Sequence, residues 1–596
     1  MFFHKYSKLS PEEVRSKFAA VPKASSPLAA PKRDRLVDCS LKLTGEFAPD
    51  LAYKFIDTER VTVTENGKSY DTAFSVAVIG PVSVLTHQVP GSDRTFTVIL
   101  DLDTLLVTVF ETWFGITVPV GGNLFGGEPS GSRDIYREVQ RHYWFGYAVS
   151  ENGRWSKEAP VKLHTSTNRL EGKGLYWEFA HGKRHLTFFP SILCSTTVEL
   201  NHQGLLGDSI TITTPADYIK ITDEFYIYAN WEAEFSGIGH IAVLDLFELK
   251  ALTLTIGFDE NDAALYRFVK AGLTVTGDAA HLEHINNQGE DLKKDAGMAL
   301  EGKGARYAYR PADMHLPMTR EEVVKACTEK QAIYEGMSIM SSANVMPFTD
   351  FLAGKKFRVI LDNEKHAAAP WAGDNKAVYE YEVIDGENLK VSINGGSYTL
   401  EKYRAFEPAK DIYLFSHQIT GDPNFLNLTV AADFSTGLVT VVHGQIGSWL
   451  HPHEASGYAK FGVLEYPGVT PPFARRHHFT TDLVGKSYAW SYSDQMASIH
   501  VYSSPESYSW TIFTGENAGG ASWSSPCFYI KLRDDAYLFQ WVEENCNGGQ
   551  GLMVFNPYIM HDAGYFYGAS ENGLQLTIMG AYARKVGSFD IAKYFN

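Results

Sequence analysis

Polar and hydrophobic residues alternate through most of the chain, in short runs broken by Gly, Asn and Asp. This period of two is typical of β-strands that bury one face. Two helix signals interrupt it. Ser10 and Glu13 form a capping box before a helix that ends near Pro22, and Thr319 and Glu322 form another before a helix predicted to reach Gly336. The pattern predicts an all-β protein with a few short helices.

One stretch of this pattern occurs twice. Residues 53–70 read YKFIDTERVTVTENGKSY, and residues 381–398 read YEVIDGENLKVSINGGSY. Both copies begin and end on Tyr, share Ile-Asp at the fourth and fifth places, and contain Asn-Gly, which favours a hairpin turn. So long a match without a gap predicts an internal duplication.

Later segments repeat in the same order. His87-Gln88 corresponds to His417-Gln418, and GKGLYWEF corresponds to GKSYAWSY. The order is therefore A-B-A′-B′. We divide the chain into an N-terminal helix and linker (1–32), barrel A (33–131), connector and barrel B (132–277), linker with helix (278–346), barrel A′ (347–447), and connector and barrel B′ (448–596).

Each block holds many short antiparallel strands, whose open edges would aggregate unless the sheet closed on itself. About eight strands form a barrel whose mouth can hold one small ligand. We therefore expect four lipocalin-like antiparallel barrels in two tandem halves. The pattern does not indicate an oligomeric state.

Charge and cysteine content narrow the function. The chain of 596 residues has a net charge of −17, which disfavours nucleic acid and anionic membrane surfaces as partners. The five Cys are scattered without a CxxC pair, so a disulfide framework or zinc ribbon is not expected. No apolar run is long enough for a membrane helix. We expect a cytoplasmic protein.

The segment HHFTTDLVGKSYAWSYSDQMASIHVYSSPESYSWTIF, residues 477–513, resembles the C-terminal domain of the MoaF-like family, also called molybdenum cofactor biosynthesis protein F. Residues 351–447, beginning FLAGKKFRVIL, resemble its N-terminal domain, and residues 33–277 resemble the family through the internal repeat. The resemblance implies calycin folds, barrels of the kind found in lipocalins and phenolic acid decarboxylases. Fold alone does not determine an activity.

Four residues are candidates for acid–base catalysis. His87 and His417 fall at equivalent places on strands, where each is either a general acid or base or a structural histidine. Glu232 and Glu543 follow aromatic strand segments. A carboxyl buried there would have a raised pKa and serve as a general acid, whereas on the outer face it would be an ordinary solvated group.

A second set of residues is expected to line a ligand site or to fill the barrel cores. Its aromatic members and the histidines at the ligand entrance are Trp177, Tyr226, Tyr228, Trp490, Tyr537, Trp541, His477 and His478. His451, His453 and Glu454 are close enough in sequence to ligate a metal, but they also fit a plain connector, and we assign no metal or cofactor site.

Together these patterns favour a cofactor-independent enzyme of secondary or aromatic metabolism, of the lyase, isomerase, dehydratase or cyclase type. Its substrate would be an apolar or aromatic small molecule enclosed by a barrel. A non-catalytic small-molecule carrier is the alternative. A role in molybdenum cofactor biosynthesis is the third possibility.

Overall fold

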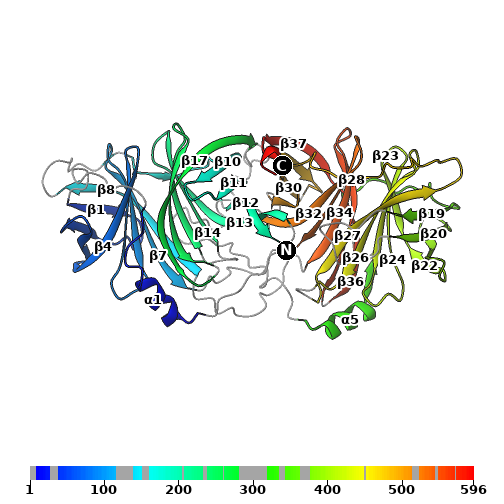
Figure 1. Ribbon diagram of the computed structural model, residues 1–596, viewed down its shortest axis with the longest axis horizontal. Helices are drawn as coiled ribbons and strands as arrows, with labels where there is room; N and C mark the ends of the chain where they lie inside the picture. The colour runs from blue at the N-terminus through cyan, green and yellow to red at the C-terminus, as the bar shows by residue number, and fades with distance from the viewer. Residues whose placement is uncertain are drawn as a thin grey trace.

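A computed structural model describes residues 9–26, 38–115, 138–150, 160, 162–192, 194–204, 207–232, 238–259, 261–280, 318–334, 343–362, 376–448, 452–494, 496–512, 522–543, 548–570 and 572–595. These residues form an all-β structure with two short α-helices and several antiparallel barrels, as the alternating pattern predicts. Figure 1 shows barrels A and A′ at the outer ends and barrels B and B′ meeting in the middle.

Barrel A is a closed eight-stranded barrel, in which β8 pairs with both β7 and β1. Its strands are β1 (Cys39–Thr44), β2 (Leu51–Phe55), β3 (Arg60–Glu65), β4 (Lys68–Ile79), β5 (Val82–Gln88), β6 (Thr95–Asp101), β7 (Leu106–Gly115) and β8 (Glu138–Ser150). The closing strand β8 therefore lies beyond position 131, the predicted end of this barrel, because the Gly-rich stretch 121–131 separates two paired strands and not two domains.

Barrel B is also closed, by pairing of its first and last strands. The short strand β9 (Thr165–Ser166) pairs with β13. The barrel strands are β10 (Lys173–Phe179), β11 (Arg184–Phe188), β12 (Cys194–Gly204), β13 (Gly207–Lys220), β14 (Phe225–Glu232), β15 (Ile238–Asp245), β16 (Lys250–Phe258) and β17 (Ala264–Ala279).

Barrel A′ is a nine-stranded sheet, because the counterpart of β4 is interrupted at Tyr403 and becomes two strands. Its last strand again lies beyond the predicted boundary at 447. The strands are β19 (Lys356–Leu361), β20 (Ala377–Val383), β21 (Asn388–Ile393), β22 (Thr399–Lys402), β23 (Arg404–Ala409), β24 (Ile412–Gln418), β25 (Asn427–Asp433), β26 (Leu438–Ile446) and β27 (Ala455–Glu465).

Barrel B′ closes where β37 pairs with β29 and β35. A short strand, β28 (His478–Phe479), precedes it, and the 3₁₀-helix η4 (Ala592–Tyr594) follows it. The barrel strands are β29 (Lys486–Ser491), β30 (Ala497–Ser504), β31 (Ser507–Ile512), β32 (Ser522–Arg533), β33 (Ala536–Glu543), β34 (Gly549–Asn556), β35 (His561–Ser570), β36 (Gly573–Met579) and β37 (Tyr582–Phe589).

The halves meet along a short ladder between β17 and β37. Asp278 pairs with Ser588, flanked by Gly277 with Phe589 and by Ala279 with Gly587. Asp278 and Ser588 are equivalent positions, since each pairs with the first residue of the equivalent strand β10 or β29. The ladder therefore runs through an internal two-fold axis that relates the two halves.

Two helices occupy equivalent places below the barrel pairs (Figure 1). Helix α1 (Pro11–Ala19) and helix α5 (Arg320–Glu329) both begin with the predicted capping box. Helix α5 ends well before Gly336, because the chain becomes extended at Lys330 and forms β18 (Gln331–Ile333), which pairs in parallel with β36. Neither helix has the length and apolar character needed to cross a membrane.

A buried ion pair joins barrels A and B. The Arg141 guanidinium on β8 donates from Nε to Asp217 Oδ2 on β13 at 2.6 Å, and its Nη2 lies 2.5 Å from the same oxygen. The Trp231 indole donates to that carboxylate at 3.2 Å and lies under the guanidinium. In the second half Gly457 occupies the place of Arg141. Arg141 pairs with Thr112, and Gly457 pairs with Gly444, the residue equivalent to Thr112.

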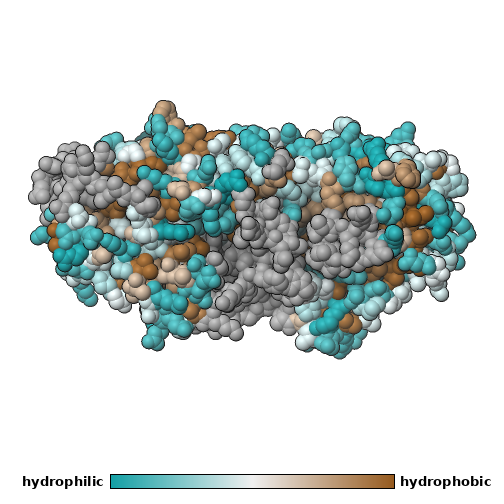
Figure 2. Space-filling model, in the orientation of Figure 1, coloured by the Kyte–Doolittle hydropathy of each residue, from teal (hydrophilic) through white to brown (hydrophobic). Residues whose placement is uncertain are grey.

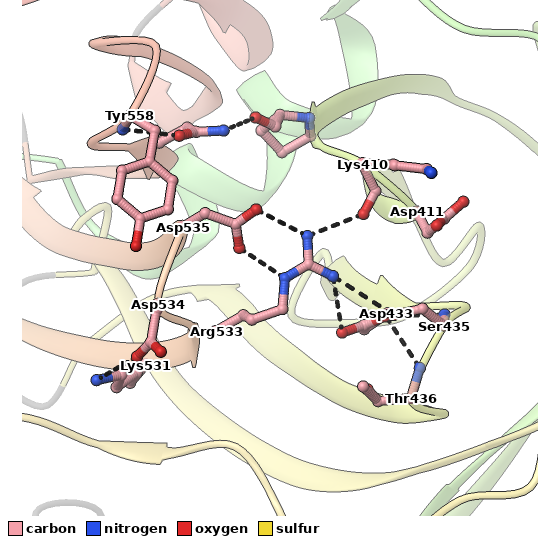
Figure 3. Close-up of polar contacts among 12 residues, drawn as sticks. Lys410, Asp411, Asp433, Ser435, Thr436, Lys531, Arg533, Asp534, Asp535 and Tyr558 are labelled. Carbon is pink, nitrogen blue, oxygen red and sulfur yellow. Dashed lines mark hydrogen bonds and ion pairs between the residues drawn. The ribbon is translucent and has the colours of Figure 1, made fainter.

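A different cluster joins barrels A′ and B′, shown in Figure 3. Arg533 donates to Asp535 from Nε at 2.6 Å and from Nη2 at 3.0 Å, and also to the carbonyl oxygen of Lys410 at 2.9 Å. Its Nη1 lies 3.4 Å from the buried Asp433. The two barrel pairs thus use different polar contacts, although their backbones correspond.

On the face shown in Figure 2, hydrophilic residues cover much of the coloured surface and hydrophobic residues form separate groups. Large aromatic side chains are instead concentrated in the barrel interiors, although Phe47, Phe247, Phe473 and Tyr558 are exposed.

Candidate functional site

Glu543 lies at the end of β33 and faces the interior of barrel B′, here called the B′ lumen. Along β33, Phe539 and Trp541 belong to the aromatic cluster of this barrel, whereas Leu538 packs in the core between A′ and B′. Since side chains alternate between the faces of a strand, Glu543 shares the inner face. Only 8% of it is exposed.

Indole and hydroxyl donors hold the Glu543 carboxylate. The Trp510 indole donates to Oε1 at 3.0 Å, the Trp541 indole donates to Oε2 at 3.0 Å, and the Ser525 hydroxyl donates to Oε1 at 3.2 Å. Burial raises the pKa of Glu543 to about 7, although these hydrogen bonds act to lower it. A carboxyl whose pKa lies near neutrality can both accept and return a proton at physiological pH.

Barrel B does not have the two indoles. Thr197 occupies the place of Trp510 and Asn230 the place of Trp541, as the equivalent strand pairings show. The Asn230 amide donates to Thr214, the counterpart of Ser525, at 3.4 Å. Glu232, the predicted partner of Glu543, ends β14, and its side chain lies outside the described residues. Barrel B′ thus has a carboxylate held by two indoles, whereas the equivalent positions in barrel B carry Thr197 and Asn230.

A second buried acid, Asp562, also faces the B′ lumen. It pairs with Phe555 at the start of β35, and its neighbour Ala563 packs outward between A′ and B′. Its exposure is 0%. Oδ1 accepts the Ala581 amide at 2.7 Å, and Oδ2 has no hydrogen-bond partner among the described residues. Burial raises its pKa to about 8.

The sequence prediction missed Asp562. Its counterpart in barrel B is Ala251, which pairs with Leu244 as Asp562 pairs with Phe555. This disagreement between the copies is a signal that was present in the sequence. Trp510 and Ser525 were also missed, because their approach to Glu543 depends on the pairing of three strands.

Further polar groups share this lumen. His500 Nε2 lies 3.1 Å from the Ser498 hydroxyl, while its Nδ1 has no partner among the described residues. Burial lowers the pKa of His500 to about 3, so the ring is neutral. Burial raises the pKa of Tyr492, and its nearness to both Asp562 and Glu543 adds to the shift, so the two acids lie around one interior.

The buried Asp562 predicts a pH-dependent stability. Because burial raises its pKa from the ordinary 3.8 to about 8, folding favours the protonated acid, and this contribution is lost as pH rises through that window. Within this window, each added pH unit lowers the free energy of unfolding by up to about 1.4 kcal/mol. Asp562→Asn does not titrate there. Urea unfolding at pH 5 and pH 9 should therefore show that the variant gains stability relative to the wild type at the higher pH.

The exposed Asp534→Asn is the matched control, since its carboxyl is largely in solvent. It should follow the wild-type curve at both pH values. Parallel curves for Asp562→Asn and the wild type would show that Asp562 is not buried as a neutral acid.

His87 and His417 lie in the interiors of barrels A and A′. In each, Nε2 lies 3.2 Å from the hydroxyl of the first Tyr of the repeated motif, Tyr53 or Tyr381. Each Nδ1 contacts the backbone carbonyl oxygen of the following Gln. Burial lowers both pKa values to about 4. Because both ring nitrogens have polar partners in both halves, this geometry favours a structural role for the two histidines over acid–base catalysis.

The predicted aromatic residues lie in two interiors. Trp177, Tyr226 and Tyr228 belong to the core of barrel B, and Trp490, Tyr537 and Trp541 belong to that of B′. The Tyr228 hydroxyl lies 2.7 Å from Ser195, and the Tyr537 hydroxyl donates to Asp482 at 3.0 Å. Among these six, Trp541 contacts Glu543. A ligand-binding role for the set stays a prediction.

His477 lies in the connector before B′, where its Nδ1 is 2.9 Å from the Thr440 hydroxyl of β26. His164 makes the same 2.9 Å contact with Thr108 in the first half. Each of these His–Thr contacts therefore links a connector to its A barrel. His478, next to His477 in the chain, is exposed.

His451 lies outside the described residues. Glu454 is buried, and the Ser448 hydroxyl donates to it. Over the described ranges, no group of three or more His, Cys, Asp or Glu side chains is placed to hold a metal ion.

Comparison with known proteins places the site within a recognised domain. No curated protein matches the chain. Residues 477–588 match the family model of the MoaF C-terminal domain, which covers barrel B′ with both Glu543 and Asp562. This confirms the resemblance predicted for the C-terminal barrel, and the second half of the duplicated chain thus ends in a MoaF C-terminal-like domain.

Proposed function

We propose that this protein is a cofactor-independent enzyme that binds an uncharged apolar or aromatic small molecule in the B′ lumen and moves a proton on it. Glu543 is the acid–base group. The observation that carries the proposal is the buried Glu543 carboxyl, held by the indoles of Trp510 and Trp541. Such a carboxyl belongs to the class of perturbed acids that occur at functional sites.

The surroundings of Glu543 suit proton transfer. Indole donors on both oxygens hold the carboxyl in one orientation, so little reorganisation is needed when it changes protonation. Tyr508 and Trp541 lie beside it, and Phe539 stacks on Trp541 with ring centroids 4.8 Å apart. An aromatic wall favours a planar, apolar substrate and excludes water from the reacting atoms.

Accepting a proton from carbon and returning it elsewhere is an isomerisation. If a leaving group departs before the proton returns, the same first step is an elimination, as in a lyase or dehydratase. The reaction class is therefore set by the substrate, while Glu543 supplies the same proton transfer.

The second candidate function is a non-catalytic small-molecule carrier. The many aromatic residues in the interior of B′ favour it, since burial of apolar ligand surface needs no acid or base. A role in molybdenum cofactor biosynthesis is the third, and it rests on the family resemblance.

The test begins with the full chain as purified. Organic extraction and mass spectrometry identify the bound molecule, which the proposal expects to be uncharged and apolar or aromatic. That molecule is then incubated with the protein in deuterium oxide. Protein-dependent conversion or deuterium uptake at carbon supports the enzyme, whereas a bound molecule that returns unchanged and undeuterated supports the carrier.

A further inference from the structure

A break in the last strand of B′ holds Asp562 in place. In barrel B the equivalent strand β17 is continuous, but in B′ it is divided into β36 and β37 at Gly580 and Ala581. The Asp562 amide donates to the Ala581 carbonyl oxygen at 3.1 Å, and the Ala581 amide donates back to Asp562 Oδ1 at 2.7 Å. Two reciprocal bonds therefore fix the carboxyl group at the break.

A segment that precedes barrel A′ covers this break. A Cβ on Gly580 would lie 2.8 Å from the Val345 Cα, so only glycine fits beneath the segment. Asn344 contacts the same end of the barrel, since its amide N–H donates to the Tyr492 carbonyl oxygen at 3.1 Å and its carbonyl oxygen lies 2.7 Å from His561 Nε2. The Asp562 end of the lumen is thus closed by packed chain.

No cation offsets the charge of Asp562 among the described residues, and the side chain is fully buried. An ionised carboxylate in such a place would be strongly unfavourable, so the neutral acid is the stable form. Because Oδ1 accepts the Ala581 amide, the acid O–H belongs on Oδ2. This O–H has no partner among the described residues, and the side chain lies on the inner face of β35, where Asp562 pairs with Phe555.

We propose that Asp562 is a hydrogen-bond-donating site for the carbonyl oxygen of an uncharged ligand in the B′ lumen. The inference rests on the proposed function for the location of the ligand, and it narrows the substrate to carbonyl compounds. An anionic ligand is disfavoured, because its negative charge would raise the pKa of both lumen acids and Glu543 must ionise to accept a proton. The neutral imidazole of His500 adds no opposing charge.

The site would act on a proton transfer next to the carbonyl. Glu543 removes a proton from the neighbouring carbon, and the C–H electron pair forms a carbon–carbon double bond. The carbonyl π pair moves onto oxygen, where the Asp562 O–H stabilises the developing charge. In a substrate with a further carbon–carbon double bond beside that carbon, the electron pair extends through this bond. Return of the proton from Glu543 to its far end then restores the carbonyl, so no oxidant or reductant is needed.

The probe is 4-hydroxyacetophenone, an uncharged aromatic ketone, and the protein is the full chain. Binding is measured by quenching of tryptophan fluorescence, and the ketone stretching band is followed by infrared spectroscopy. Wild type should bind with the band shifted to lower frequency. Asp562→Ala, which installs the residue of barrel B, should weaken binding at least about 10-fold and reverse the shift. Asp562→Asn, which keeps a donor, should lie between them.

Equal affinity and an equal band position in wild type and Asp562→Ala would overturn the inference, as would absence of binding to the wild type. Thr253→Ala in barrel B is the matched control and should bind the ketone as the wild type does. Glu543→Gln separates the two proposals. If it keeps the Asp562-dependent band shift but converts the extracted ligand at the wild-type rate, the proposed function fails while the Asp562 site stands.

Discussion

Glu543→Gln should lower the turnover of the extracted ligand by about 100- to 10,000-fold, the usual contribution of a positioned acid or base. Glutamine keeps the size of the side chain but cannot carry the proton. Its amide NH₂ also faces one of the two indole donors, Trp510 or Trp541, so one hydrogen bond to the carboxyl is replaced by two opposed donors. Steady-state rates with the extracted ligand provide the measurement.

The pH profile gives an independent readout. Burial raises the pKa of Glu543 to about 7, so a general base there becomes competent as pH rises through neutrality. Replacing either indole with Trp510→Phe or Trp541→Phe removes a donor that stabilises the charged form, and should move the profile to higher pH.

Thr214→Ala alters the position in barrel B that corresponds to Ser525, and it should leave turnover unchanged. If Glu543→Gln retained full turnover with an unaltered pH profile, Glu543 would not be the acid–base group.

Asp217→Ala should destabilise the first half by about 3–5 kcal/mol, because it leaves the Arg141 guanidinium buried without its carboxylate. Both side chains are only 5% exposed, so water cannot replace the lost partner. The indole N–H of Trp231 loses the same acceptor. Urea unfolding followed by tryptophan fluorescence measures the change, with the loss expected in the transition that reports on barrels A and B.

Lys356→Ala is the control, because its ion pair with Glu382 is exposed and surface pairs contribute little. No measurable change is expected from it. Restoring stability with the double variant in which Arg141 becomes Met would support the physical reason, since it removes the unpaired charge. A loss for Asp217→Ala no larger than that for Lys356→Ala would show that the pair does not hold the two barrels together.

The sequence pattern predicted the all-β class, the duplication and the helix starts, because strand alternation, repeated hairpin residues and capping boxes are local signals. Strands β8 and β27 lie beyond the predicted ends of the A barrels at 131 and 447, because the pairing of a last strand with a first strand is not a local signal. Glu543 and Trp541 were predicted separately as catalytic and ligand-binding residues. Trp510 and Ser525 approach Glu543 because separate strands pair, and no local sequence pattern encodes that pairing.

The ladder between β17 and β37 has a consequence for how this chain evolves. In a half-length protein the same ladder would join two identical subunits, and every substitution would appear on both sides of the axis. Fusion of the halves frees each side to change alone. A buried acid such as Asp562, which lowers stability, is then present once, while Ala251 occupies the equivalent position in barrel B. Only barrel B′ therefore loses stability, and barrel B keeps an apolar residue there.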